Sequence, residues 1–385
     1  MARIVIWVQS LLGIGHLRRM LLFAGTLARR GHRVVVANGG PPSPWPAADG
    51  VRIVQLEPLR AADSTFSLLL DGGHRPPSEA LWSARLAQLR RLSRSFAPEA
   101  LVIEHFPFGR HAFARELLPW LSTVRRQRPA IPFIASVRDV LVRKKDLSRY
   151  EEMARLVRRW FDLVIVHADP SFVPFGASFP ALGAIQDRLR YAGYLVEPRL
   201  LDLTPAPERR GVVISAGGGA VGARLFETAL AARRLSRLAA EPWTFVAGSQ
   251  PSTVPFARLA PPPSRVHGEV ILLSHDPDLP LRIAKARVSV SQAGYNTVVE
   301  TLMAGTPMLL VPFARDDETE QTERACCLAE RGFASWLAED ALTPPSLAAA
   351  IDATATRPSP PLHLAVDAGE RAAMLVEAAL GRRER

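Results

Sequence analysis

The chain begins with a strand, a glycine-containing turn, a helix and a second strand, an order that strongly restricts how it can fold. Residues 3–9 are a predicted strand with an apolar centre at residues 4–8, residues 16–30 are a predicted helix, and residues 33–38 are a second predicted strand with an apolar centre at residues 34–37. Gly31 ends the helical segment, a common role of glycine. A βαβ unit of this kind places its two strands parallel in one sheet.

The same alternation continues along the chain and predicts an α/β protein. Further apolar runs are bounded by polar turns, with helical stretches between them at residues 78–95 and 147–160. The alternation breaks at residues 197–210, a polar, proline-containing segment typical of an interdomain linker. We therefore expect two doubly wound, Rossmann-like domains facing a cleft, at residues 1–196 and 211–385, with the last stretch helical and closing the second domain.

Composition fits this organisation and limits the location of the protein. A length of 385 residues with 48% apolar positions allows two cores, and 22% charged residues excludes wholesale disorder. The two cysteines, Cys326 and Cys327, are adjacent and therefore make neither an ordinary structural disulfide nor a metal pair. No apolar run reaches about 18 residues, and the start lacks the pattern of a signal peptide. We expect a cytoplasmic protein, either free or peripheral at the inner face of the membrane.

The positive charge is concentrated in the first half. Residues 1–196 carry 28 basic and 15 acidic side chains, a net charge of +13, whereas residues 197–385 have a net charge of −2. This favours anionic partners such as phospholipid headgroups or phosphorylated substrates, although a solvated arginine-rich surface is the alternative. Nucleic acid is disfavoured, because single strands favour aromatic platforms among the basic residues. The aromatic residues expected near a membrane-facing surface are Trp82, Phe106, Phe108 and Trp120.

The most specific motif lies in the segment 288–313. A strand leads to Gly294, where a ligand can approach the backbone closely, and a helix then begins. The N–H groups and positive dipole end of that helix predict a seat for a diphosphate. The residues that open the helix are Tyr295, Asn296 and Thr297. Glu300, about one turn further on, is placed to accept hydrogen bonds from paired ribose hydroxyls. The alternative is an ordinary strand-to-helix turn with a solvent-facing glutamate.

Two other segments of the second half are predicted to lie at the same sheet edge. Gly217, Gly218 and Gly219 follow its first strand, so their N–H groups face an anion or the reacting sugar unless the turn serves only tight packing. Glu320 and Gln321 belong to an acidic segment after a later strand. They are suited to bonding sugar hydroxyls, and the segment also complements a helix dipole.

These motifs resemble the donor-binding domain of the GT-B glycosyltransferases, closest to glycosyltransferase family 28 and the predicted glycosyltransferases related to the lipid-linked N-acetylglucosaminyltransferases of peptidoglycan synthesis. The similarity runs from Gly217 through the Gly294 motif to Ala325. It implies that the glycine turn and the following helix hold the diphosphate of a nucleotide sugar. It also implies that Glu300 binds ribose, that Glu320 and Gln321 contact the donor sugar, and that Leu273 lies over the base.

The first half is similar to the same family in its Gly-x-Gly-His turn at residues 13–16. A dinucleotide fingerprint would need glycine where Arg18 stands, so a nicotinamide site is not expected. Gly15 and His16 are predicted to line the cleft, with His16 as either the general base or a donor contact. The turn lacks an additional adjacent glycine of the peptidoglycan enzymes. The acceptor is therefore left open among small-molecule, lipid-linked and glycan hydroxyls.

Two carboxylates of the first half are further candidates for the base. Glu104 and Asp139 each lie at or just beyond the end of a predicted strand, and each either removes a proton or forms a structural ion pair. Asp276 and Asp278 look like an Asp-x-Asp metal motif, but they precede a helix, where capping is the expected role.

Together, the motifs and the resemblance predict a metal-independent, inverting hexosyltransferase without a cofactor, which uses a nucleotide sugar as donor, with a UDP-sugar expected. A UDP-sugar hydrolase and a non-catalytic nucleotide-sugar-binding or membrane-associated protein are the alternatives. Release of free sugar without an acceptor would identify the hydrolase, and donor binding without turnover would identify the non-catalytic protein.

Overall fold

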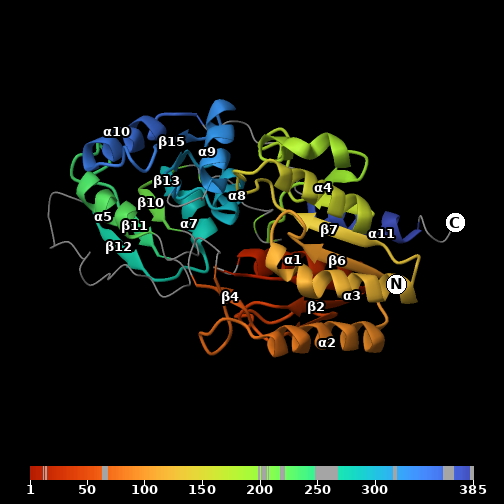
Figure 1. Ribbon diagram of the computed structural model, residues 1–385. Helices are drawn as coiled ribbons and strands as arrows, with labels where there is room; N and C mark the ends of the chain where they lie inside the picture. Colours follow the sequence, from red (N-terminus) through yellow and green to blue (C-terminus); the bar gives the residue numbers. More distant parts are fainter. Residues whose placement is uncertain are drawn as a thin grey trace. The chain divides into compact units, whose positions relative to one another are not determined.

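The computed structural model describes residues 1–11, 13, 15–62, 68–197, 200, 206, 208–216, 222–247, 268–314, 319–358 and 368–381. The chain forms two compact units, the first made of Met1–Leu195 and Ala365–Arg385 and the second of Val196–Leu364. Each unit contains a parallel sheet with helices (Figure 1), so the expected α/β class with two doubly wound domains is confirmed.

The main sheet of the first unit has the strand order β3-β2-β1-β6-β7-β8-β9, with every neighbouring pair parallel. Its central strands are buried along their length, which explains their unbroken apolar sequence. The strands are β1 (Arg3–Val8), β2 (Arg33–Asn38), β3 (Val51–Gln55), β6 (Ala100–Glu104), β7 (Phe133–Val137), β8 (Leu163–Val166) and β9 (Leu189–Tyr191). A small antiparallel pair joins β4 (Arg60–Ala61) and β5 (Leu69–Leu70).

Helices cover both faces of this sheet. The helices are α1 (Gly15–Arg29), α2 (Glu79–Phe96), α3 (Ala114–Gln127), α4 (Ser148–Trp160) and α11 (Ala368–Gly381), with 3-10 turns η1 (His111–Phe113), η2 (Phe175–Ala177) and η3 (Pro180–Ile185). Helices α2 and α4 confirm the two helical stretches predicted from periodicity. Trp7 of β1 packs edge to face on Phe113, which in turn contacts Trp82 of α2.

The last helix, α11, belongs to the first unit and not to the second, where the sequence had placed it. Its apolar side chains Ala372, Ala373 and Val376 are buried in the same core as α1 and β1. The Arg30 guanidinium donates to Glu370 at 2.8 Å and to Glu377 at 2.6 Å. Helix α11, near the C-terminal end of the chain, is therefore part of the core of the first unit.

The second unit has the strand order β12-β11-β10-β13-β14-β15, again parallel throughout. Helices α5 and α10 pack on the core of one face, and α7 lies on the other face beside α8. The strands are β10 (Val212–Ser215), β11 (Trp243–Val246), β12 (Val270–Leu273), β13 (Val288–Ser291), β14 (Met308–Leu310) and β15 (Ser335–Trp336). The helices are α5 (Ala223–Ala232), α7 (Leu279–Lys285), α8 (Tyr295–Ala304), α9 (Glu320–Glu330) and α10 (Pro344–Ala355).

Each sheet has one point at which the strand order reverses. In the first unit β1 lies between β2 and β6, and in the second β10 lies between β11 and β13. Ligands of open α/β sheets bind outside the carboxyl ends of the strands at such a point. The ends of β1 and β6, and of β10 and β13, are therefore where functional groups are expected.

The aromatic residues expected at a membrane-facing surface are instead buried. Trp82 is 6% exposed, Phe108 1%, and Phe106 and Trp120 are fully buried. They fill the core between sheet and helices, so this part of the sequence interpretation is wrong. Across the described part of the chain, no helix combines the length and the apolar character needed to cross a membrane.

Candidate functional site

The reversal point of the first sheet brings two predicted base candidates together. His16 is the second residue of α1, which follows β1, and Glu104 is the last residue of the neighbouring strand β6. His16 Nδ1 lies 2.6 Å from Glu104 Oε1. Both side chains are buried, at 8% and 0% exposure. The two residues therefore form one hydrogen-bonded pair and are not alternatives.

Arginine side chains converge on this pair. Arg19, one turn after His16, donates to the same Glu104 Oε1. Arg110 Nη2 lies 3.2 Å from His16 Nε2, on the other side of the ring. Burial, and after it the charges of Arg138, Arg110 and Arg19, hold the pKa of His16 well below its usual value. His16 is therefore neutral near neutral pH.

The partners of the neutral imidazole assign its proton. Nδ1 faces a carboxylate oxygen, which only accepts, and Nε2 faces a guanidinium group, which only donates. The proton therefore belongs on Nδ1 and the lone pair on Nε2, an assignment made from the hydrogen-bond partners. A histidine held in this way has the tautomer and orientation that a general base needs.

The loop after β6 is shaped to hold this site. His105 has a φ of +65°, and its ring packs edge to face on His16 at 5.4 Å between centroids. A Cβ on Gly109 would lie 2.5 Å from the His105 ring, so only glycine fits there. Burial lowers the pKa of His105 well below its usual value. Sequence reasoning did not single out His105, Arg19 and Arg110 as site residues; the one-turn spacing of Arg19 from His16 was one signal that could have found it.

Asp139, the third base candidate, follows β7 and is 1% exposed. Its Oδ1 accepts the N–H of Val140 at 2.9 Å. Glu104, and not Asp139, bonds His16. In β7 itself, Ser136 is the register partner of Glu104, and its Oγ lies 2.8 Å from Nε2 of the buried His167.

In the second unit, Gly294 is the N-cap of α8 and gives that helix no side-chain cap. Its φ of −64° and ψ of 140° suit any residue, and a Cβ there would meet no atom of the described residues within 4 Å. Gly305 differs, because its φ of +59° at the C-cap favours glycine. Among the described residues, neither conformation nor packing calls for glycine at 294, and the backbone there is open to a ligand in front of the helix N-terminus.

Two buried hydroxyls lie beside this helix N-terminus. Ser215 and Ser291 are register partners at the ends of β10 and β13, and both are 1% exposed. Ser289, on the same face of β13, lies 3.4 Å from Thr301 Oγ1 in α8. Ser291 is two residues nearer the carboxyl end, which places it beside the first turn of α8. Neither Ser215 Oγ nor Ser291 Oγ has a hydrogen-bond partner among the described residues. The sequence interpretation did not single them out.

The other residues predicted for the α8 motif are placed as follows. Glu300 is 6% exposed, so it is not the solvent-facing glutamate of the alternative interpretation. Tyr295 and Thr297 are also buried, whereas Asn296 is half-buried. Thr301 Oγ1 donates to the carbonyl of Thr297 at 2.7 Å within the helix.

Glu320 and Gln321 tie α9 to neighbouring loops. Arg324 donates to Glu320 Oε1 at 2.8 Å and to the carbonyl of Ala293 at 2.7 Å. Gln321 Oε1 accepts the N–H of Phe313 at 2.9 Å. The structure thus brings Glu320 to the segment just before α8, and both side chains already have partners within the protein.

The remaining predicted positions divide into described and undescribed ones. Gly217, Gly218 and Gly219 lie outside the described residues. Leu273 is the half-buried last residue of β12, and Gly15 is the first residue of α1. Asp276 accepts the N–H of Asp278 at 2.9 Å and pairs with Arg282 Nε at 2.6 Å, a structural role. Over the described ranges, no group of three or more His, Cys, Asp or Glu side chains is arranged to hold a metal ion.

Comparison with known protein families agrees with the geometry of the second unit. Residues 213–373 match the model described as "Glycosyltransferase family 28 C-terminal domain". The second half of this chain resembles glycosyltransferase family 28. The resemblance expected from the motifs is therefore confirmed.

Among curated proteins, similarity to family 28 enzymes extends over part of the chain. A UDP-N-acetylglucosamine--N-acetylmuramyl-(pentapeptide) pyrophosphoryl-undecaprenol N-acetylglucosamine transferase of Rhodospirillum centenum is 36% identical over 83 residues, 22% of each chain. The protein of the same name from Phenylobacterium zucineum is 31% identical over 182 residues, 44% of this chain and 49% of its own. The chain thus matches between about a fifth and a half of the length of these two relatives.

Solved structures match the fold over nearly the whole chain. The calicheamicin glycosyltransferase CalG4 has a TM-score of 0.60 at 20% identity, with 99% of both chains covered. MurG of Acinetobacter baumannii has a TM-score of 0.59 at 16% identity, covering 98% of this chain and 100% of its own. A UDP-glucosyltransferase from Polygonum tinctorium has a TM-score of 0.62 at 15% identity, covering 100% and 93%. At these identities the likeness establishes the fold, which is GT-B.

Proposed function

We propose that this protein is an inverting glycosyltransferase that moves a sugar from a UDP-sugar to a hydroxyl group of an acceptor. The observation that carries the proposal is the buried His16–Glu104 pair at the reversal point of the first sheet. The second unit, with its similarity to a family 28 C-terminal domain, supplies the donor site. The first unit, with its excess of basic residues, holds the acceptor.

In this mechanism His16 Nε2 accepts the proton of the acceptor hydroxyl. The hydroxyl oxygen forms a bond to the anomeric carbon while the bond from that carbon to the UDP oxygen breaks, and UDP leaves with the electron pair. One direct displacement inverts the anomeric centre. Glu104, 2.6 Å from Nδ1, stabilises the positive charge that develops on the imidazole.

The proposed donor seat lies at the N-terminus of α8. Its first N–H groups and dipole stabilise the diphosphate as negative charge develops on the leaving group. Ser215 and Ser291 contribute two more donors from the adjacent strand ends. Glu300 is assigned to the ribose, and Glu320 and Gln321 to the sugar, as the resemblance implies. Because these groups neutralise the diphosphate, we expect the reaction to proceed without a divalent metal.

The proposal is tested by supplying UDP-sugars with a panel of alcohols, phosphorylated sugars and glycans, and measuring UDP and glycoside. His16→Gln should lower transfer by about 10²- to 10⁴-fold. It should leave UDP binding, measured by calorimetry, unchanged, because the donor seat lies in the other unit. Undiminished transfer by His16→Gln would overturn the proposed mechanism.

Hydrolysis of the UDP-sugar is the second candidate, because a His–Glu pair activates water as well as an alcohol. The same assay separates the two. A hydrolase releases free sugar at one rate whether or not an acceptor is present. A transferase forms glycoside at the expense of free sugar when the acceptor is added.

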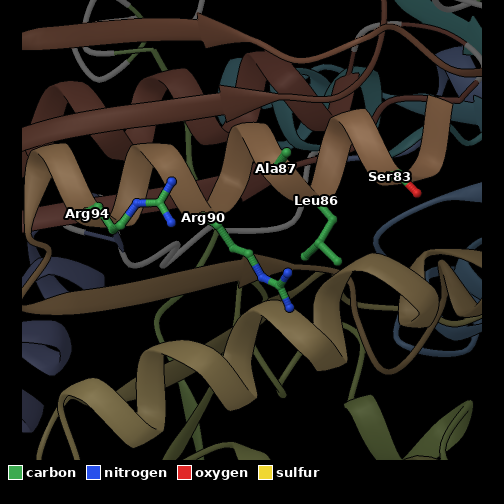
Figure 2. A pocket seen from close by; sticks show the side chains of 5 residues that line it. All are labelled: Ser83, Leu86, Ala87, Arg90 and Arg94. Atoms are coloured by element: carbon green, nitrogen blue, oxygen red, sulfur yellow. The ribbon is translucent and has the colours of Figure 1, made fainter. Parts of the chain in front are cut away.

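We further propose that the first unit docks on anionic membranes, where a lipid-linked acceptor would be found. The support is its charge, together with a hollow of about 340 Å³ along one side of α2. Figure 2 shows the side chains that line it, which are Ser83, Leu86, Ala87, Arg90 and Arg94. Two guanidinium groups beside one hollow suit a phosphate headgroup.

A further inference from the structure

The lone pair that the proposed mechanism needs is already occupied. Arg110 Nη2 lies 3.2 Å from His16 Nε2, and Arg110 Nε donates to the carbonyl of Gln9 at 2.8 Å. A neutral imidazole has one lone pair, in the plane of the ring, and here it points to a guanidinium group. An acceptor hydroxyl and Arg110 therefore cannot use Nε2 at the same time.

The acceptor of each of these two Arg110 hydrogen bonds is a weak one. The imidazole nitrogen of His16 and the carbonyl of Gln9 are both neutral. Hydrogen bonds from a guanidinium to a carboxylate or phosphate are roughly twice as strong as those between neutral groups, and are often bidentate. An oxyanion that reaches Arg110 therefore competes well with these two acceptors, whereas a neutral alcohol does not.

The surroundings favour an anion at this place. Arg19 on α1 and Arg138 after β7 add to the positive potential at the imidazole. The carboxylate in contact with the imidazole, that of Glu104, also accepts a hydrogen bond from Arg19. The neighbouring His105 and His167 are neutral, because burial lowers the pKa of both, that of His167 to about 3.

We propose that Arg110 blocks the His16 base until an oxyanion of the acceptor, close to the reacting hydroxyl, draws its guanidinium off Nε2. This inference rests on the proposed function and adds to it the class of acceptor, an alcohol bearing a phosphate or carboxylate. It also gives the block a role: without acceptor, Nε2 is unavailable to water, so the donor is not hydrolysed.

The direct test needs no donor or acceptor. The side chains of ¹⁵N-histidine-labelled protein are followed by NMR in the wild type, Arg110→Gln and Arg110→Lys, with His16→Gln assigning the signal. Arg155→Gln, an exposed change on α4, is the control. Arg110→Gln should raise the pKa of His16, because it removes one of the positive charges that lower it. Inorganic phosphate should shift the Nε2 signal of the wild type and not that of Arg110→Gln, and acetate should act more weakly.

A second probe, vesicles of phosphatidylglycerol, distinguishes a lipid phosphate from a soluble one. A response to phosphate alone indicates a soluble phosphorylated acceptor, and a response to vesicles indicates a lipid phosphate. A His16 signal that ignores both anions in the wild type, or that is unchanged in Arg110→Gln, overturns the proposal even if glycosyl transfer is demonstrated.

The activity assay then supplies an independent check. Arg110→Gln should raise hydrolysis of the UDP-sugar without acceptor by about tenfold or more, and Arg110→Lys by less. Equal hydrolysis by the wild type and Arg110→Gln would contradict the block. Absence of hydrolysis and transfer in every variant would count against the proposed function. The NMR result would then still test whether Arg110 contacts His16 Nε2 and whether an anion breaks that contact.

Discussion

At the scale of single residues, the candidate sites show how neighbours set the chemistry of an ordinary side chain. His16 alone is an unremarkable helix residue. The carboxylate on its Nδ1, the arginines around it and its burial make it a neutral, oriented base. None of these partners is adjacent to it in sequence except Arg19, one turn away, so the sequence could nominate His16 and Glu104 but not join them.

The pH dependence of transfer should reflect these neighbours. A base acts in its neutral form, so kcat/KM falls as pH drops through the pKa of His16, which lies well below 6.5. We expect activity to persist on the acid side of pH 6.5. Arg138→Gln removes the first of the charges that lower this pKa and should move the acid limb towards 6.5. A limb that stays in place, measured at subsaturating donor, would show that the charge of Arg138 does not act on His16.

Gly294 provides a test that separates ligand binding from folding. Since a Cβ there meets no described atom within 4 Å and the backbone suits any residue, Gly294→Ala should leave the free energy of unfolding nearly unchanged. The added methyl group lies where the diphosphate is proposed, so UDP affinity should fall at least tenfold. Gly305→Ala is the matched control: its positive φ should cost about 1 kcal/mol of stability, with UDP affinity kept. Unchanged UDP affinity in Gly294→Ala would show that the diphosphate does not bind at this position.

Replacing Ser291 is expected to weaken UDP binding without lowering stability, whereas replacing an ordinary core residue lowers stability. Its buried hydroxyl has no partner among the described residues, so Ser291→Ala should not lower thermal stability. If the hydroxyl donates to the diphosphate, UDP affinity should fall about five- to tenfold, the equivalent of one hydrogen bond. Ser289→Ala, on the same face and in contact with Thr301, should leave affinity unchanged. Equal affinities in the two variants would assign Ser291 no role in binding.

At the scale of elements, the strand and helix pattern was predictable where periodicity is strong. The βαβ start and helices α2 and α4 follow from local sequence, and the Gly294 motif lies at a strand end as expected. Helix α11 was assigned to the wrong domain, because its apolar residues specify a buried face but not which core it fills. The partnership of Arg30 with Glu370 and Glu377 spans more than 300 positions, and no local signal marks it.

The attachment of α11 should be sensitive to acid. The Arg30 hydrogen bond, aided by His32, lowers the pKa of Glu377 to about 2, so its ionised form stabilises the folded state. That contribution is complete above the unfolded pKa of 4.5 and is lost as pH falls towards 2. The unfolding midpoint of the wild type should therefore drop more steeply between pH 5 and about 2 than that of Glu377→Gln. Parallel curves, measured by denaturant titration at each pH, would show that the ion pair contributes nothing.

At the scale of the whole molecule, charge divides the chain between two proposed tasks. The first half carries +13 and the second −2. This difference supports the proposals that a membrane or an anionic acceptor meets the first unit and that the second unit binds its anion through helix geometry. Reversing two charges along α2, Arg90→Glu with Arg94→Glu, should reduce co-sedimentation with phosphatidylglycerol vesicles about tenfold or more, because each basic residue near the surface contributes about 1 kcal/mol. Arg224→Glu with Arg234→Glu makes the same change in net charge on exposed residues of the second unit and should have little effect. Binding of the wild type should also weaken at high salt. Equal losses in the two double variants would mean that net charge, and not the face of α2, attracts the membrane.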